Sequence, residues 1–427
     1  MAASLKSIPC QNCGAPIEIK ARGISVTFVC HSCGSVIDAT RDGYEVLQQA
    51  VVQEDILDKL FVALGSRGKL FDVEWEVIGF VSRKDVKWGF SWDEYLLFNP
   101  YHGFRFLIHS EFHFSFAQLL TTKPLGSPEG IVLGISSSTY DIFHRGISQV
   151  TAVAGEFYWR VRLNERCEYA DFVSPPEGIT VEVPEGSDDV ERTFTLSRYI
   201  SVDEVERAFG ISGLLRPVTI SPIQPNPHLR NAPAVWFAAI TCCIGMFLAQ
   251  SYFVSASQEL NVFRGVRSFS RVEAGVEQLL GEFEIEGRPR NVEIRSYSPV
   301  SNSWVEVDYE IEREDGGESG WASQAIEYYF GRSDGESWSE GSTFSTSVIG
   351  AVSPGRYKVF ATVEADSFAR DMVASVETRI RVDVPIWSNL FIALFALLVY
   401  PLLLLALGRS FERRQWQDSD YSPYSYE

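Results

Sequence analysis

The segment Ala232–Gln258 contains 27 residues and no charged side chain. A helix needs about 20 apolar residues to cross a hydrocarbon layer of about 30 Å. Trp236 lies near one end and Tyr252 and Phe253 near the other, where aromatic side chains favour the membrane interface. A buried core helix is the alternative, but such a helix is usually shorter and carries a polar stripe. We therefore predict a transmembrane helix over residues 234–256, surrounded by the lipid bilayer.

A second uncharged run, Val384–Gly408, has the same character and predicts a second transmembrane helix over residues 385–408. Three basic residues, Arg409, Arg413 and Arg414, follow it. Lys and Arg are enriched on the cytoplasmic side of membrane helices. We therefore expect a two-pass topology in which both ends of the chain are cytoplasmic and the segment between the two helices is extracytoplasmic.

Two Cys-x-x-Cys pairs lie near the start of the chain, separated by sixteen residues. The four cysteines are Cys10, Cys13, Cys30 and Cys33. Each pair is followed by a glycine, Gly14 or Gly34, which permits the tight turn that directs backbone amides at the sulfurs. Four thiolates at this spacing form a closed tetrahedral site for structural Zn²⁺. We predict a zinc ribbon over residues 1–40 that stabilises the fold or docks a protein.

Composition limits the possible partners. The net charge is −19 and the isoelectric point is about 4.9. Nucleic-acid binding requires a basic surface, so we expect no nucleic-acid partner. All seven cysteines lie before or within the first predicted span, which places the metal-binding thiolates in a reducing compartment if that part is cytoplasmic.

Residues between the ribbon and the first span are patterned as β-strands. Apolar residues alternate in Phe71–Val81, and short strands separated by turn residues follow it. We predict antiparallel β meander or barrel-like units at 44–125 and 126–215. The second unit ends in a short helix, Ser201–Gly210, with a serine cap and a glutamate three residues later. Five prolines predict a stiff linker over 216–233.

An enzyme would need a convergent acid, base or nucleophile set. Asp93 and Glu94 are adjacent on a predicted strand, so their side chains point to opposite faces and cannot share one proton. His109 and His113 flank a turn and are expected to be structural. Cys167 has no assignable base, which favours a buried thiol. We therefore expect no catalytic residues.

Between the two spans, about seven strands with polar turns predict a β-sandwich over 257–384. Its segment Asp334–Ser342 contains a tryptophan among acids and glycines. The candidate ligand-binding residues are Asp334, Glu336, Trp338 and Glu340. We interpret them as a loop with an aromatic platform for a sugar or peptide, with Ca²⁺ as a further candidate on the carboxylates, although the spacing matches no EF-hand. In the alternative interpretation, Trp338 plugs the end of the core.

Several strings in this chain resemble one family. They are the ribbon, LGSRGKL, WEVIGFV, WDEYLLFNP, GFRFL and YADFVSPPEGITVE, together with GESWSEGS and PGRY between the spans. The chain is similar to long, membrane-anchored bacterial proteins of the domain of unknown function 4178 family, which carry an N-terminal zinc ribbon. The resemblance implies a bacterial inner (cytoplasmic) membrane and an association with envelope stress. The family has no established reaction, so no catalytic residue can be carried over.

The predicted fold class is mainly β. A zinc ribbon and cytoplasmic β units precede two transmembrane helices that flank an extracytoplasmic β-sandwich. The predicted divisions are 1–40, 44–125, 126–215, 216–233, 234–256, 257–384, 385–408 and a disordered cytoplasmic tail at 409–427. We expect a non-enzymatic binding, sensory or adaptor protein with unidentified cytoplasmic and envelope protein partners. The alternatives are a structural accessory subunit of a membrane complex, or an enzyme acting in the cytoplasmic β units.

Overall fold

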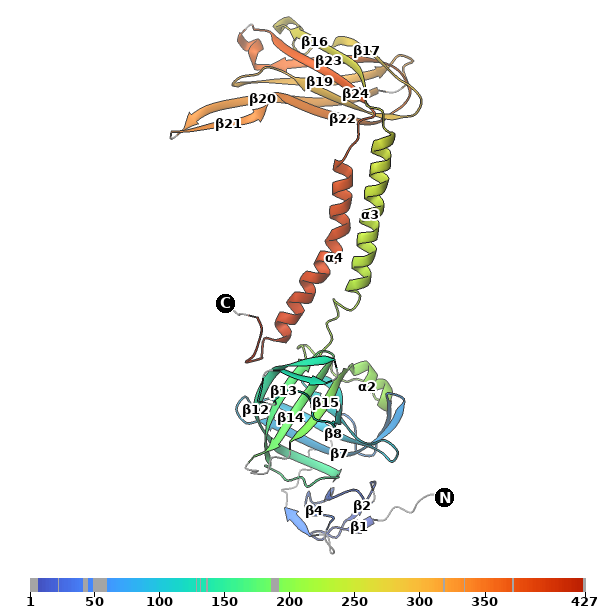
Figure 1. The fold of residues 1–427 in the computed structure, drawn as a ribbon, viewed down its shortest axis with the longest axis vertical. Helices are drawn as coiled ribbons and strands as arrows, with labels where there is room; N and C mark the ends of the chain where they lie inside the picture. The colour runs from blue at the N-terminus through green and yellow to red at the C-terminus, as the bar shows by residue number, and fades with distance from the viewer. Residues whose placement is uncertain are drawn as a thin grey trace. The chain divides into compact units, whose positions relative to one another are not determined.

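The computed structural model describes residues 7–21, 23–40, 45–48, 60–127, 129–130, 132–135, 137–185, 192–317, 319–333, 335–370 and 372–424. Strands account for 50% of the described residues and helices for 17%, which confirms the predicted mainly β class. The chain forms two compact units (Figure 1). The barrel unit contains Met1–Pro233 and Leu402–Glu427, and the sandwich unit contains Ala234–Pro401.

A small cysteine-bearing subdomain begins the barrel unit. Its first hairpin pairs two short strands, β1 (Ser7–Pro9) and β2 (Pro16–Glu18). Its second group is antiparallel and contains β3 (Thr27–Val29), β4 (Val36–Asp38) and β5 (Val46–Gln48). Strand β3 also pairs with a long strand of the barrel, so the subdomain extends the same sheet.

The barrel is one closed antiparallel sheet. Its strands are β6 (Arg67–Leu70), β7 (Val73–Asp85), β8 (Ser91–Asn99), β9 (Gly103–Ser110), β10 (His113–Leu119), β11 (Val132–Ile135), β12 (Ser138–Phe157), β13 (Arg166–Ser174), β14 (Glu177–Pro184) and β15 (Thr193–Ile200). The order β12-β13-β14-β15-β10-β9-β8-β7 closes because β7 also pairs with β12. The two β units predicted at 44–125 and 126–215 therefore share a single sheet, joined where β10 pairs with β15 and β7 with β12.

The two faces of the barrel sheet differ in chemistry. Arg83 on β7 reaches Glu182 on β14 at 3.6 Å, although β12 and β13 lie between these strands in the sheet. Only the concave inner face brings such side chains together, so these charged residues point inside. Apolar side chains such as Val81 and Leu96 share the inner face with them. The apolar outer face packs against helix α2 (Val202–Phe209). Ser201 and Glu204 form a reciprocal capping box at the start of α2, as predicted.

The sandwich unit has two antiparallel sheets. Its strands are β16 (Leu260–Phe269), β17 (Gln278–Ile285), β18 (Arg290–Tyr297), β19 (Ser303–Arg313), β20 (Ser319–Ser333), β21 (Glu336–Ser342), β22 (Phe344–Val352), β23 (Gly355–Ala365) and β24 (Ala374–Val382), with short 3-10 helices η1 (Arg271–Glu273) and η2 (Asp366–Arg370). One sheet has the order β16-β24-β18-β22 and the other β17-β23-β19-β20-β21. The Tyr309 hydroxyl joins them, 2.7 Å from Ser296 Oγ and 2.8 Å from Thr378 Oγ1.

Two long apolar helices are present, α3 (Ala232–Ala256) and α4 (Ser388–Gln415). Both are long and apolar enough to cross a membrane. Only 11% of the most apolar part of each is buried, whereas a core helix of a soluble protein would be mostly buried. Pro401 lies inside α4.

The end of the chain differs from the predicted disordered tail at 409–427. Helix α4 continues to Gln415, whose amide donates hydrogen bonds to the carbonyls of Ser221 and Gln224 at 2.9 and 2.8 Å. The Trp416 ring then packs on Phe143 of the barrel, with ring centroids 5.4 Å apart. These long-range contacts hold the segment, and a local sequence pattern cannot reveal them.

Candidate metal centre and outer binding face

The two cysteine knuckles have the same local structure. The amide of Gly14 donates to the carbonyl of Cys10, and that of Gly34 donates to the carbonyl of Cys30, each at 2.8 Å. Both glycines have a positive φ, 78° and 69°, which costs little only without a Cβ atom. Each knuckle therefore folds back as the sequence predicted.

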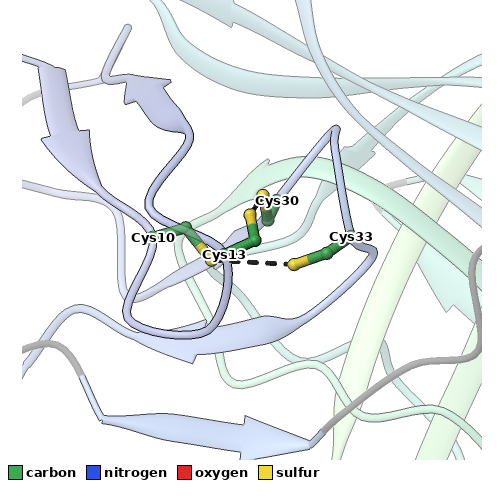
Figure 2. A group of neighbouring side chains, drawn as sticks. All are labelled: Cys10, Cys13, Cys30 and Cys33. Atoms are coloured by element: carbon green, nitrogen blue, oxygen red, sulfur yellow. Dashed lines mark hydrogen bonds between the residues drawn. The ribbon is translucent and has the colours of Figure 1, made fainter.

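The folded knuckles bring the four sulfurs together (Figure 2). The Sγ atoms of Cys10 and Cys33 are 3.7 Å apart, and those of Cys13 and Cys30 are 3.6 Å apart. All four lie within 4.8 Å of one another. A disulfide would require about 2.05 Å, so these are four free thiols converging on one point. The arrangement is compatible with a metal site.

The pKa values of two of the thiols are shifted in opposite directions. Burial raises the pKa of Cys30 to about 12. Burial acts to raise the pKa of Cys33 as well, but hydrogen bonds from Ser35 and Asn12 outweigh it and lower that pKa to about 6. A metal ligand must be a thiolate, so metal binding at this site would release protons and weaken as pH falls.

A buried carboxylate attaches the cysteine subdomain to the barrel. Glu156 of β12 is only 3% exposed, and burial raises its pKa. Its Oε1 accepts hydrogen bonds from the amides of Lys20 and Ala21 at 2.8 and 3.0 Å, and its Oε2 accepts one from Ser25 Oγ at 3.1 Å. No local sequence pattern indicates this residue, because its partners lie more than 130 positions away.

The candidate ligand residues of the sandwich unit lie on a strand rather than on a loop. Asp334 lies outside the described residues. Glu336, Trp338 and Glu340 alternate along β21, which pairs with β20, so they share one face of the sheet. Trp338 is 46% exposed and its ring covers Gly331, so it does not plug the core.

The strand register continues this face across the five-stranded sheet. The exposed carboxylates on it include Glu282, Glu284, Glu306, Asp308, Glu310, Glu312, Glu327, Glu336, Glu340 and Glu364, and they outnumber the cations Arg356 and Lys358 on the same face. Its aromatic residues include Trp304, Trp321, Tyr329, Trp338 and Phe360. A shallow cavity of about 180 Å³ lies on it, lined by both Trp321 and Phe360 and by the carboxylates Glu277, Asp308 and Glu310. We call this surface the acidic outer face.

The barrel interior holds a third cluster that the sequence did not reveal. Arg83 Nε lies 3.1 Å from Glu94 Oε1, and the guanidinium also contacts Glu182. Burial raises the pKa of Glu94, and it raises the pKa of the nearby Asp171 to about 6. Burial also raises the pKa of Cys167, which keeps its thiol protonated.

The candidate catalytic residues do not converge. Asp93 points to the outside of the barrel, 3.4 Å from His109, while Glu94 points to its interior, as predicted for adjacent strand residues. His113 lies 3.1 Å from the Tyr199 hydroxyl and 3.2 Å from the carbonyl of Thr219. Both histidines therefore make contacts within the barrel unit: His109 contacts a residue of β8, and His113 contacts β15 and the linker.

Residues 63–202 match the family described as Domain of unknown function (DUF4178). This segment spans the closed barrel from before β6 to the start of α2. The chain contains a DUF4178 domain. The DUF4178 segment thus corresponds to the barrel, while the cysteine subdomain, both long helices and the sandwich lie outside the match.

The comparison with curated proteins found no match. Among solved structures, an infectious bursal disease virus structure (Gt strain) is 11% identical, with 85% of this chain and 67% of that chain covered and a TM-score of 0.19. A PNGF-II structure is 10% identical, with coverages of 72% and 68% and a TM-score of 0.20. Scores this low establish no shared fold.

Proposed function

We propose that this DUF4178 protein is a non-enzymatic, two-pass protein of the bacterial cytoplasmic membrane with a binding, sensory or adaptor role. The observation that carries the proposal is the position of its two exposed apolar helices. Three residues separate α3 from β16, and five separate β24 from α4. The helices therefore bracket the sandwich and would hold it on the opposite side of a bilayer from the barrel.

The orientation follows from the basic residues at the end of the second helix. Arg409, Arg413 and Arg414 lie in the last two turns of α4. The positive-inside rule assigns this end to the cytoplasm, together with the barrel and both ends of the chain. The sandwich is then extracytoplasmic.

For the cysteine cluster we propose structural Zn²⁺. A tetrahedron with metal–sulfur bonds of about 2.3 Å has edges of about 3.8 Å. The sulfur separations of 3.6 and 3.7 Å fit that edge. Four cysteines would leave no open position for a substrate, so the ion would stabilise the subdomain. Cys13→Ser or Cys33→Ser should lower the zinc content of the purified protein, whereas Cys167→Ser should not. Equal zinc in all three variants would contradict the assignment.

For binding outside the membrane we propose the acidic outer face. Ion pairing with a cationic partner would relieve repulsion among its carboxylates, and its tryptophan rings can contact an ammonium or guanidinium group. An oligolysine peptide should bind the full-length protein more tightly than an oligoglutamate peptide. Asp308→Asn with Glu310→Gln should weaken that binding at low salt.

A structural accessory subunit of a larger complex is the second candidate function. It would use the same surfaces with a permanent partner, and crosslinking in native membranes would recover that partner in fixed stoichiometry. An enzyme in the barrel is the least supported alternative. The Thr219 hydroxyl lies 3.3 Å from His113 Nε2, but Asp93 and Glu94 point to opposite faces and do not complete a catalytic set with this pair.

The topology is tested by adding protease outside intact spheroplasts. Cleavage should occur within the sandwich, and the cysteine subdomain should be cut only after lysis. Protection of the sandwich with loss of the subdomain would reverse the orientation. Release of the chain from membranes by carbonate would refute the two-pass proposal.

A further inference from the structure

One end of the barrel receives both chain segments that lead to the long helices. The linker reaches it at Thr219, whose carbonyl lies 3.2 Å from His113 Nε2 at the start of β10. The segment after α4 reaches it where Trp416 packs on Phe143. Because neighbouring strands are antiparallel, the turn between β7 and β8 lies at this same end. We call this turn, Val86–Phe90, the apolar turn.

The apolar turn exposes three large hydrophobic side chains. Val86 is 46% exposed, Trp88 52% and Phe90 40%. The exposed charges within the turn and directly before it are cationic, because Lys84 and Lys87 are exposed whereas Asp85 is fully buried. The exposed carboxylate of Asp420 approaches the turn through His144. The Lys87 ammonium lies 4.3 Å from the centre of the Trp88 ring. A tryptophan and a phenylalanine flanked by lysines are typical of a segment that lies in a membrane interface.

The buried carboxylate of Asp85 holds the turn in this conformation. Asp85 Oδ1 accepts hydrogen bonds from the amides of Lys87 and Trp88 at 2.8 and 2.6 Å. Its Oδ2 accepts one from the Tyr169 hydroxyl at 2.9 Å. The exposed side chains are therefore presented on a fixed backbone, so inserting them into another phase would require little ordering.

The length of α4 places this end of the barrel near a bilayer. The helix continues for seven residues beyond Gly408, which is about 10 Å at 1.5 Å per residue. The polar headgroup layer on each side of a membrane is about 5–8 Å thick. Trp416 follows directly and contacts Phe143, while the ring of Phe90 lies 5.6 Å from that of His144, the next residue. The turn thus lies beside the point where α4 meets the barrel.

We propose that the apolar turn Val86–Phe90 inserts into the interfacial layer of the membrane, as a third contact beside α3 and α4. Trp88 and Phe90 enter the region between headgroups and acyl chains, and Lys84 and Lys87 contact anionic headgroups. The inference rests on the proposed two-pass topology. It gives the barrel a fixed orientation on the lipid surface, which the two helices alone would not provide.

The test uses the full-length protein in vesicles of phosphatidylcholine and phosphatidylglycerol. An environment-sensitive fluorescent amino acid replaces Trp88, Tyr101 or Phe247 in separate preparations, and lipids carrying a nitroxide near the headgroup act as quenchers. Tyr101 is the matched control, since it is 92% exposed in the turn at the other end of β8. Phe247 lies within α3 and reports the span itself.

Lipid quenching at positions 88 and 247, without quenching at 101, is the expected result. Quenching at 247 but not at 88 overturns the inference and leaves the two-pass topology intact. Absence of quenching at 247 removes the topology and the inference together. Replacing the anionic lipid by phosphatidylcholine should reduce quenching at 88 and not at 247. A fluorophore at position 88 that is shielded from water but not quenched by the lipid nitroxides would assign the turn to a protein contact and also overturn the inference.

Discussion

The barrel and the sandwich are both antiparallel β structures, but they place their charges on opposite sides of their sheets. In the barrel, Arg83, Glu94 and Glu182 face inward and contact one another. In the sandwich, the interior is apolar and the carboxylates of β19 face outward. A charge enclosed by a sheet depends on its partners for stability, whereas a charge displayed on a sheet is available to other molecules.

The largest expected effect concerns the enclosed charges. The Arg83 side chain is only 10% exposed, and Arg83→Met leaves Glu94 and Glu182 without their cation. Removing one partner of a buried ion pair costs about 3–5 kcal/mol, so the barrel should lose that much unfolding free energy. Denaturant-dependent proteolysis of the full-length protein measures it. Arg67→Met is the control, because Arg67 is 65% exposed in its pair with Glu76 and should cost at most about 1 kcal/mol.

The pH dependence of the barrel gives the next effect. Burial raises the pKa of Asp171 from 3.8 to about 6, so between these values the folded state holds a proton that the unfolded state has released. The unfolding free energy should therefore fall as pH rises through this window, by up to about 3 kcal/mol. Asp171→Asn should remove this contribution in unfolding experiments at pH 4 and pH 7. An unchanged pH profile in the variant would show that Asp171 is not the responsible group.

The sandwich should respond less, because its interior contains few polar groups. Tyr309→Phe removes the hydroxyl that joins Ser296 and Thr378 across the two sheets. Each hydroxyl loses a buried partner, so the expected loss is about 1–2 kcal/mol. Tyr329→Phe on β20 is the control and should change the unfolding free energy by less than about 0.5 kcal/mol. Equal losses of unfolding free energy in the two variants would show that the hydrogen bonds of Tyr309 between the two sheets add no stability.

The smallest effect is expected on the acidic outer face. Glu306 stands directly opposite Glu364 in the register of β19 and β23. Like charges in cross-strand pairs are destabilising, so Glu306→Gln should raise the unfolding free energy by about 0.2–0.5 kcal/mol at low salt. The gain should vanish at high salt as the repulsion is screened. Glu94→Gln should instead lower the unfolding free energy of the barrel. Changes of the same sign at both sites would contradict the proposed difference between enclosed charges in the barrel and displayed charges on the sandwich.

Local patterns predicted much of this architecture. The cysteine spacing predicted the convergence of four sulfurs, alternation predicted the strands, and two uncharged runs predicted the long helices. Closure of the barrel was not predictable, since it depends on pairs such as Val81 with Val153, which no local pattern specifies. Nor could the sequence show that β21 continues the sheet, because its residues are exposed on both faces and carry no apolar alternation.

The enclosed cluster was missed for a specific reason. The alternation through Phe71, Val73, Trp75 and Val77 would put Arg83 on the same side as these residues. The register of β7 shifts between Val77 and Gly79, and this bulge reverses the side to which later residues point. Arg83 therefore enters the interior, a change that the polar and apolar pattern does not reveal.

The three hydrogen bonds received by Glu156 have a thermodynamic consequence. They tie the segment between the two cysteine knuckles to the longest strand of the barrel, so ordering either part favours the other. If the thiols bind a metal ion as proposed, any change that stabilises the barrel should raise their affinity for the ion, and removing the ion should destabilise the barrel by the same free energy. A chelator titration followed with a metal indicator would therefore report changes in the stability of the barrel.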